Sequence, residues 1–153
     1  MKYNIPEVGV LEIKTIVLDL NGTLAVNGKI IKGVKNLLTK IKKLGIKIIL
    51  FTGDARGNAY DLCKNLDIEF KKAINQKEKE KFFLELDTEK TAAIGNARID
   101  NGKFKHAKLS IATLQEEGIH TGILKYVDII VPSIIDALNL FIDEKIMKAT
   151  MRK

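Results

Sequence analysis

Residues 15–24 read TIVLDLNGTL, an apolar run that ends on the carboxylate of Asp19 and passes at once into a polar turn with a glycine. An apolar run bounded by turn residues is typical of a buried strand in a parallel sheet. In open α/β sheets, ligand-binding groups lie just beyond the carboxyl ends of the strands. The sequence therefore predicts that Asp19 lies at the functional edge of such a sheet.

The rest of the chain alternates between predicted strands and helices. Further strands are expected near 7–13, at 46–51, near 68–74, and at 91–94, 109–112 and 128–131. Helices are expected at 33–44, 56–65, 77–87, 100–107 and 133–147. The Asn27-Gly28 pair between apolar flanks predicts a hairpin. This alternation indicates an α/β fold, a doubly wound parallel sheet. Because no linker interrupts it, residues 1–153 are expected to form a single domain.

Composition predicts an ordinary globular domain. The chain has 153 residues, of which 46% are hydrophobic and 29% charged. Its one cysteine, Cys63, excludes an internal disulfide and fits a reducing compartment. No apolar run approaches the roughly 18 residues of a membrane helix, and the first residues lack the apolar core of a signal peptide. We therefore expect a cytoplasmic protein with no membrane partner.

The net charge of +7 raises the question of a nucleic-acid partner. The lysines are spread along the whole chain, and no basic stretch is interleaved with stacking aromatics. A nucleic-acid partner is therefore not expected. The many lysines and isoleucines, with no tryptophan, favour genome bias or the heat-adapted surface of a thermophile.

Polar residues recur at the ends of the predicted strands. Asp19 follows the first buried strand, Thr52 ends the second, and Asn96 with Asp100 follows the strand at 91–94. Lys79 lies in the helix before that last strand. Together, an aspartate, a threonine, a lysine and an amide with a carboxylate make a set suited to binding phosphate and a metal.

The order and spacing of this set resemble the four motifs of the haloacid dehalogenase superfamily of phosphotransferases. Residues 19–24, DLNGTL, resemble its Asp-x-Asp-Gly-Thr-Leu loop, and residues 51–54, FTGD, resemble its second motif. Lys79 stands where the third motif's lysine is expected, with Lys77 and Lys81 as alternatives. Residues 94–100, IGNARID, resemble the fourth motif, Gly-Asp-x-x-x-Asp. The TGD triplet and residues 91–118 look most like the phosphorylation domain of P-type ATPases and its small soluble relatives.

The resemblance implies a Rossmann-like core that acts on a small phosphorylated substrate with Mg²⁺ as cofactor. Asp19 would be the nucleophile that forms an aspartyl phosphate. The metal ligands would be Asp19, the backbone carbonyl of Asn21, Asn96 and Asp100. Phosphate would be bound by Thr52 and by the turn and loop residues Gly22, Thr23 and Gly53. Lys79 would offset the negative charge gathered around the phosphate.

Two residues depart from the superfamily pattern. Asn21 stands where hydrolytic members usually carry a second aspartate, which protonates the leaving group and then activates water. Because an amide can do neither, slow turnover or a substrate with a good leaving group is expected. Asn96 replaces a charged metal ligand with a neutral one, which should weaken magnesium binding. The alternative is a catalytically weak or inactive relative that binds a phosphorylated ligand or a partner.

The gaps between the motifs are too short to hold a cap domain. An uncapped site is open to solvent, so a homo-oligomer in which a second copy covers it is a further hypothesis.

Each site residue also has an ordinary structural interpretation. Asp19 with the following glycine is compatible with a simple turn, and Thr52 and Asp54 are suited to cap the helix that follows them. Asp100 is compatible with an N-cap, and Lys79 lies in a run of alternating charges (77–81) typical of a solvated helix face. His106 and His120 have no partner at metal-ligand spacing and are expected at the surface. The role of Arg98 stays open.

Overall fold

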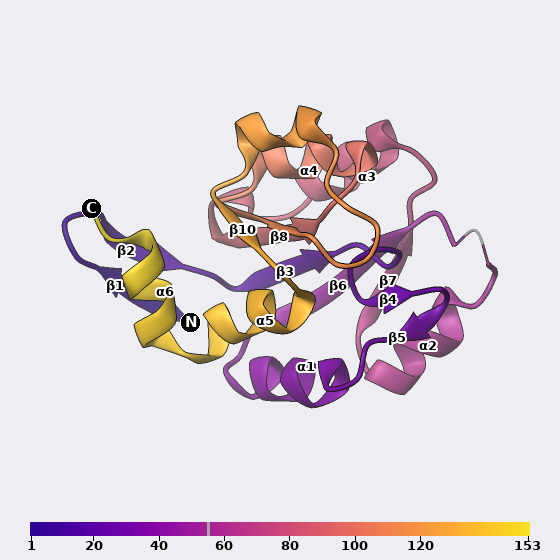
Figure 1. The fold of residues 1–153 in the computed structure, drawn as a ribbon, viewed down its shortest axis with the longest axis horizontal. Coiled ribbons are helices and arrows are strands. Elements are labelled where there is room, and N and C mark those ends of the chain that lie inside the picture. The colour runs from indigo at the N-terminus through magenta and orange to yellow at the C-terminus, as the bar shows by residue number, and fades with distance from the viewer. Residues whose placement is uncertain (55) are drawn as a thin grey trace.

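The apolar run at 15–18 forms the central strand of a six-stranded sheet. A computed structural model describes residues 1–54 and 56–153 (Figure 1). All six strands are parallel, in the order β10-β9-β8-β3-β6-β7. Their bounds are β3 Thr15–Leu18, β6 Lys47–Thr52, β7 Glu69–Lys72, β8 Thr91–Gly95, β9 Leu109–Thr113 and β10 Ile129–Val131.

Helices cover both faces of the sheet, which explains why its inner strands β3, β6 and β8 are largely apolar on both sides. One layer holds α1 (Val34–Lys43), α2 (Ala59–Leu66) and α5 (Ile134–Ile142) (Figure 1). The other holds α3 (Gln76–Leu84), α4 (Asn101–His106) and the 3₁₀ helix η3 (Thr121–Tyr126). In β3, Ile16 and Leu18 pack into the first core and Val17 into the second. The predicted doubly wound α/β fold is confirmed.

The segments between the motif-bearing strands are short. Between β3 and β6 lie the hairpin β4 (Ala25–Val26) and β5 (Lys29–Ile30), and then α1. The hairpin turns at Asn27 and Gly28, both with positive φ, as the Asn-Gly signal predicts. Between β6 and α3 lie α2 and β7. Within the described residues, neither segment contains a cap domain.

The N-terminus and the C-terminus form a structure that the sequence patterns predict only in part. Strand β1 (Lys2–Ile5) pairs with β2 (Gly9–Glu12) in an antiparallel hairpin, of which only the second strand is expected from the sequence. Helix α6 (Glu144–Met151) packs against β1 (Figure 1).

The prediction of a single helix at 133–147 is wrong, because the chain breaks at Asp143. The Asp143 side chain accepts a hydrogen bond from the Lys145 backbone N–H at 2.9 Å and so begins α6 as a new helix. Short 3₁₀ helices also occur at Thr88–Lys90 (η1) and Arg98–Asp100 (η2), the latter leading directly into α4.

The sheet topology places the predicted motifs together. In register, Leu18 of β3 lies beside Leu50 of β6 on one side and Ile94 of β8 on the other. The chain runs outward from β3 to β6 and β7, then crosses back to β8, so the direction of winding reverses beside β3. A ligand site is expected at such a reversal, beyond the carboxyl ends of the strands. Among the described residues, no helix combines the length and hydrophobicity that crossing a bilayer requires.

Candidate functional site

Asp19 lies at the carboxyl end of β3 and is 7% exposed. Its backbone N–H donates to the Ile94 carbonyl of β8 at 3.2 Å, which continues the ladder one residue past the strand. The chain then turns sharply, and the Ala25 N–H donates to the Leu20 carbonyl at 2.9 Å. This turn fixes the Asp19 carboxylate at the edge of the sheet.

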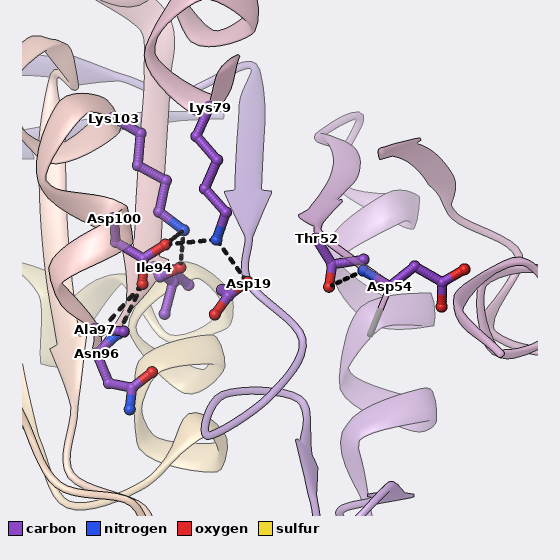
Figure 2. Close-up of polar contacts among 9 residues, drawn as sticks. All are labelled: Asp19, Thr52, Asp54, Lys79, Ile94, Asn96, Ala97, Asp100 and Lys103. Atoms are coloured by element: carbon purple, nitrogen blue, oxygen red, sulfur yellow. Dashed lines mark hydrogen bonds and ion pairs between the residues drawn. The ribbon is translucent and has the colours of Figure 1, made fainter. Parts of the chain in front are cut away.

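Lys79 of α3 points into the site and meets two carboxylates. Its Nζ lies 2.7 Å from Asp19 Oδ1 and 2.9 Å from Asp100 Oδ1, and the residue is 1% exposed (Figure 2). Lys77 and Lys81 are exposed on the same helix. The structure therefore places Lys79, among the three candidate lysines, at the predicted nucleophile, and the solvated-face interpretation of Lys79 is wrong.

Asp100 is fully buried, and four donors surround its carboxylate. Oδ1 accepts from Lys79 and lies 3.0 Å from Nζ of Lys103. Oδ2 accepts from the backbone N–H groups of Asn96 and Ala97 at 3.1 and 3.2 Å (Figure 2). A carboxylate has about four lone-pair sites, so these donors occupy them all. Asp100 would have to release one of them to bind a metal.

Lys103 of α4 is a site residue that lies outside the four motifs. It is fully buried, and its Nζ also donates to the Ile94 carbonyl at 2.8 Å (Figure 2). The only signal in the sequence is its spacing of three residues from Asp100, which puts both side chains on one side of a helical turn. That spacing is also common on exposed helices, so it does not predict burial.

The buried charges balance one another. Two lysines face two carboxylates, and with both lysines protonated their charges sum to zero. Burial raises the pKa of Asp100, but Lys103 and Lys79 outweigh it and hold that pKa at about 2. Burial and the neighbouring Asp100 carboxylate raise the pKa of Asp19, against the opposing effect of Lys79. The lysines therefore hold Asp100 ionised, whereas at Asp19 burial and the Asp100 carboxylate outweigh them.

Asn96 follows β8 and presents an unsatisfied oxygen. Its Nδ2 donates to the Gly118 carbonyl at 2.9 Å, while its Oδ1 is buried without a hydrogen-bond partner in the described structure. The buried hydroxyl oxygen of Thr23, in the turn after Asp19, also has no hydrogen-bond partner in the described structure. Buried polar atoms are normally hydrogen-bonded, so two unsatisfied atoms among the predicted ligand-binding residues are consistent with a bound ligand.

Gly22 permits a close approach at the turn. Its φ is +68°, and a Cβ at this position would lie 2.4 Å from Oε2 of Glu117 and 2.7 Å from Nδ2 of Asn96. A side chain would therefore have to displace both groups. Glu117, in the loop after β9, is a second residue near the site that the motif analysis misses, because only the packing of that loop brings it there.

Thr52 is the last residue of β6, beside β3, and Gly53 and Asp54 follow it. Thr52 is 2% exposed, and its Oγ1 accepts from the Asp54 N–H at 3.2 Å. Asp54 Oδ1 accepts from the Ala59 N–H at 2.8 Å, at the start of α2, so Asp54 has the capping contact that its position suggests. Figure 2 shows these side chains apart from the cluster of Asp19, Lys79 and Asp100.

A surface cleft of about 440 Å³ opens beside Asn96. Arg98, Glu117 and His120 line it together with Asn96. Arg98 and His120 are exposed, and the His120 side chain accepts from the Gly122 N–H. His106, on the other hand, is half-buried and lies 2.8 Å from Glu80. Because Asn96 is one of the predicted metal ligands, this cleft adjoins the predicted metal site.

The remaining oxygen donors fit a magnesium ion. In the part of the chain that the structure describes, no three His, Cys, Asp or Glu side chains gather in a metal-binding cluster. The free donors are the second carboxylate oxygen of Asp19 and the orphaned Oδ1 of Asn96, with the Asn21 carbonyl in the adjoining turn. Mg²⁺ commonly binds one or two carboxylates and keeps several waters, so this sparse set of hard oxygens is compatible with it.

Comparisons with known proteins agree with the fold. No protein-family model matches the chain. An uncharacterized protein of Methanocaldococcus jannaschii is 40% identical over 63 residues, which cover 41% of this chain and 68% of that protein.

The solved structures with the same architecture include phosphatases and an ATPase domain. The cobalt-bound deoxy-D-mannose-octulosonate 8-phosphate phosphatase of Haemophilus influenzae has a TM-score of 0.75 at 14% identity, covering 93% of this chain and 94% of that one. The Moraxella catarrhalis 3-deoxy-D-manno-octulosonate 8-phosphate phosphatase, in complex with a magnesium ion, a phosphate ion and a KDO molecule, has a TM-score of 0.70 at 18% identity, covering 86% of this chain and 87% of that one. The catalytic domain of a CPx-ATPase, CopB-B, has a TM-score of 0.61 at 24% identity, covering 74% and 46%.

These likenesses define the class of the fold. The chain has the haloacid dehalogenase fold that its four motifs predict, and it resembles both the phosphatases and the P-type ATPase catalytic domain of that class. By identity and coverage, it also belongs to the same family as the uncharacterized M. jannaschii protein.

Proposed function

We propose that the protein is a magnesium-dependent phosphohydrolase or phosphotransferase that acts through an aspartyl phosphate on Asp19. The observation that carries this proposal is the buried ion pair at 2.7 Å between Asp19 and Lys79, at the carboxyl end of the central strand. Lys79 orients one carboxylate oxygen and leaves the other without a partner among the described residues. Phosphatases of the same fold support the general reaction class.

The proposed reaction has two displacements at phosphorus. In the first, a carboxylate oxygen of Asp19 forms a bond to phosphorus as the bond to the leaving-group oxygen breaks. In the second, water attacks the same phosphorus, and the carboxylate is released with inorganic phosphate. Lys79, the Thr52 hydroxyl and the N–H groups of the turn at 21–23 would hold the phosphoryl oxygens. Mg²⁺ on Asp19, the Asn21 carbonyl and Asn96 would neutralise part of their charge.

The amide of Asn21 sets the expected substrate class. An amide neither protonates a leaving group nor activates water, and a general acid–base contributes roughly 10² to 10⁴ in rate. Acyl phosphates, aryl phosphates and nucleotide anhydrides need that proton less than alkyl phosphates do. We therefore expect small substrates with good leaving groups, with their non-phosphate part in the cleft beside Asn96.

A phosphatase assay tests this proposal. Wild-type protein with Mg²⁺ should hydrolyse acetyl phosphate and p-nitrophenyl phosphate, and Asp19→Asn should remove the activity. Asp61→Asn, a change of the same chemistry on the exposed face of α2, is the matched control and should leave the rate unchanged. Equal rates in wild type and Asp19→Asn would refute Asp19 as the nucleophile.

The second candidate is a phosphate-binding protein with little or no turnover. When all four buried groups are ionised their charges already balance, and both Asn21 and Asn96 lack the charge that the chemistry uses. The Asn21→Asp variant distinguishes the two candidate functions. It should raise the turnover of an otherwise competent site by about 10²-fold or more. Phosphate binding by that variant, without any increase in rate at saturating Mg²⁺, would favour the binding role.

A further inference from the structure

Asn96, a predicted metal ligand, forms hydrogen bonds with the loop after β9. Asn96 Nδ2 donates to the Gly118 carbonyl at 2.9 Å, and the His120 N–H donates to the Asn96 carbonyl at 3.0 Å. Both the side chain and the backbone of Asn96 therefore hold the segment that carries Glu117. This segment is far along the chain from the Asp19 turn, and Asn96 brings the two together.

The Glu117 carboxylate lies against the turn that follows Asp19. A Cβ on Gly22 would come within 2.4 Å of its Oε2, a distance that real side chains do not adopt. Gly22 is therefore the residue that lets the carboxylate reach this position. Within the described residues, Glu117 forms no ion pair or hydrogen bond, so its charge is not committed elsewhere.

Without Glu117, the predicted metal site has only one carboxylate free to bind a cation. Asn21 and Asn96 contribute neutral oxygens, and the lone pairs of Asp100 are taken by two lysines and two backbone N–H groups. Only Asp19 remains as an ionised ligand, and it shares its charge with Lys79. Because Mg²⁺ affinity rises with the number of charged ligands, one shared carboxylate predicts weak binding.

Two observations concern the same turn. The Glu117 carboxylate lies against Gly22 without a partner among the described residues, and Asn96, whose Nδ2 lies beside the same glycine, has a buried Oδ1 without a hydrogen-bond partner and is only 4% exposed. We propose that Glu117 is the second carboxylate of the magnesium site and supplies the negative charge that Asn96 does not. This inference rests on the metal dependence in the proposed function and adds a residue from outside the four motifs.

Binding of Mg²⁺ to the protein without substrate tests the role of Glu117. In isothermal titration calorimetry with MgCl₂, Glu117→Gln should weaken the affinity by about ten- to a hundredfold. Glu116→Gln, the same change on the exposed neighbour, is the matched control and should bind Mg²⁺ as the wild type does. Because Glu117 is exposed, both variants should unfold at the same urea concentration as the wild type when no metal is present.

A second substitution tests whether Glu117 replaces the missing charge at position 96. Asn96→Asp should tighten Mg²⁺ binding, and Glu117→Gln should cost less affinity in that background than in the wild type. Equal losses in the two backgrounds would contradict the proposed replacement. Wild-type affinity in Glu117→Gln would overturn the inference, as would a fall in kcat with unchanged affinity, which would indicate a proton-transfer role instead.

The readout is independent of turnover, so the two proposals fail separately. Tight Mg²⁺ binding that depends on Glu117, in a protein with no phosphatase activity, would refute the proposed function and support this inference. Turnover through Asp19, with Mg²⁺ affinity unaffected by Glu117→Gln, would support the proposed function and refute this inference.

Discussion

Lys103 is an unusual residue for a protein interior, because it buries a second ammonium group beside that of Lys79. Its removal would leave Asp100 with one cation in place of two. Breaking a buried ion pair by removing one partner typically costs about 3 to 5 kcal/mol. Since Lys79 and two backbone N–H groups remain on Asp100, we expect Lys103→Met to lower the free energy of unfolding by about 3 kcal/mol.

Urea unfolding at neutral pH measures this loss. Lys105→Met is the matched control, because Lys105 is exposed on the same helix. A Lys103→Met variant as stable as the control would show that the second lysine does not stabilise the buried carboxylates.

The positions of Asp19 and Asn96 were predictable because each directly follows a predicted strand, and the parallel order of the sheet brings these strand ends to one edge. For the lysine, the sequence narrows the choice only to Lys77, Lys79 and Lys81, and the burial of Lys79 in α3 distinguishes it from the other two. Lys103 and Glu117 were not predictable in this way. Lys103 becomes a site residue only through its burial where α4 packs against α3, and Glu117 only through the path of the loop after β9.

Among the elements, β1 depends on the C-terminal helices that pack beside it. Tyr3 of β1 is fully buried, and its hydroxyl donates to the Phe141 carbonyl at the end of α5 at 2.8 Å. Burial and the nearby Glu144 raise the pKa of Tyr3 above its ordinary range, so the hydroxyl stays a donor. Tyr3→Phe removes this hydrogen bond and leaves a buried carbonyl with one partner fewer.

We expect Tyr3→Phe to lower the free energy of unfolding by about 1 kcal/mol, without changing Mg²⁺ binding or phosphatase activity. Thermal and urea unfolding measure the first effect. Tyr60→Phe, at an exposed position of α2, serves as the control. A loss of activity in Tyr3→Phe would instead mean that the terminal hairpin communicates with the site.

The element boundaries show what the periodicity of apolar residues can and cannot predict. Apolar residues continue at helical spacing from Ile134 to Met147, so the pattern favours one helix. The break at Asp143 depends on a single side chain that caps α6, and a capping residue does not interrupt an apolar pattern. The inner strands β3, β6 and β8 were easier to predict, because burial on both faces makes each of them a largely apolar run.

At the scale of the molecule, the buried charges make stability depend on pH. Asp100 has a pKa of about 2 in the folded protein, below its value in the unfolded chain. A depressed carboxyl pKa contributes stability that is fully present above the unfolded pKa, about 4, and is lost as the pH falls toward about 2. The raised pKa of Asp19 acts in the opposite sense, because folding then favours its protonated form.

Urea unfolding between about pH 5 and about pH 2 isolates the Asp100 contribution when wild type and Asp100→Asn are compared. We expect the stability of the wild type to fall more steeply toward low pH than that of the variant. Parallel pH profiles would show that Asp100 does not titrate with a depressed pKa.

The fold as a whole was predictable from the sequence, but contacts between copies of the chain were not. Alternating strands and helices predict a doubly wound sheet, and the described elements between the motifs leave the site without a cap. Whether a second copy of the chain covers this open site stays a prediction, because sequence patterns within one chain do not specify an interface.

The most direct test of the proposed phosphoenzyme is to measure the mass of the phosphorylated protein. Because Asn21 cannot activate water, the aspartyl phosphate should persist long enough to be detected. Incubation with acetyl phosphate and Mg²⁺, acid quenching and mass spectrometry should show one added phosphoryl group on the peptide that contains Asp19, and none in Asp19→Asn. An unmodified wild-type protein that still releases phosphate from acetyl phosphate, or the same adduct in Asp19→Asn, would contradict Asp19 as the phosphoryl acceptor.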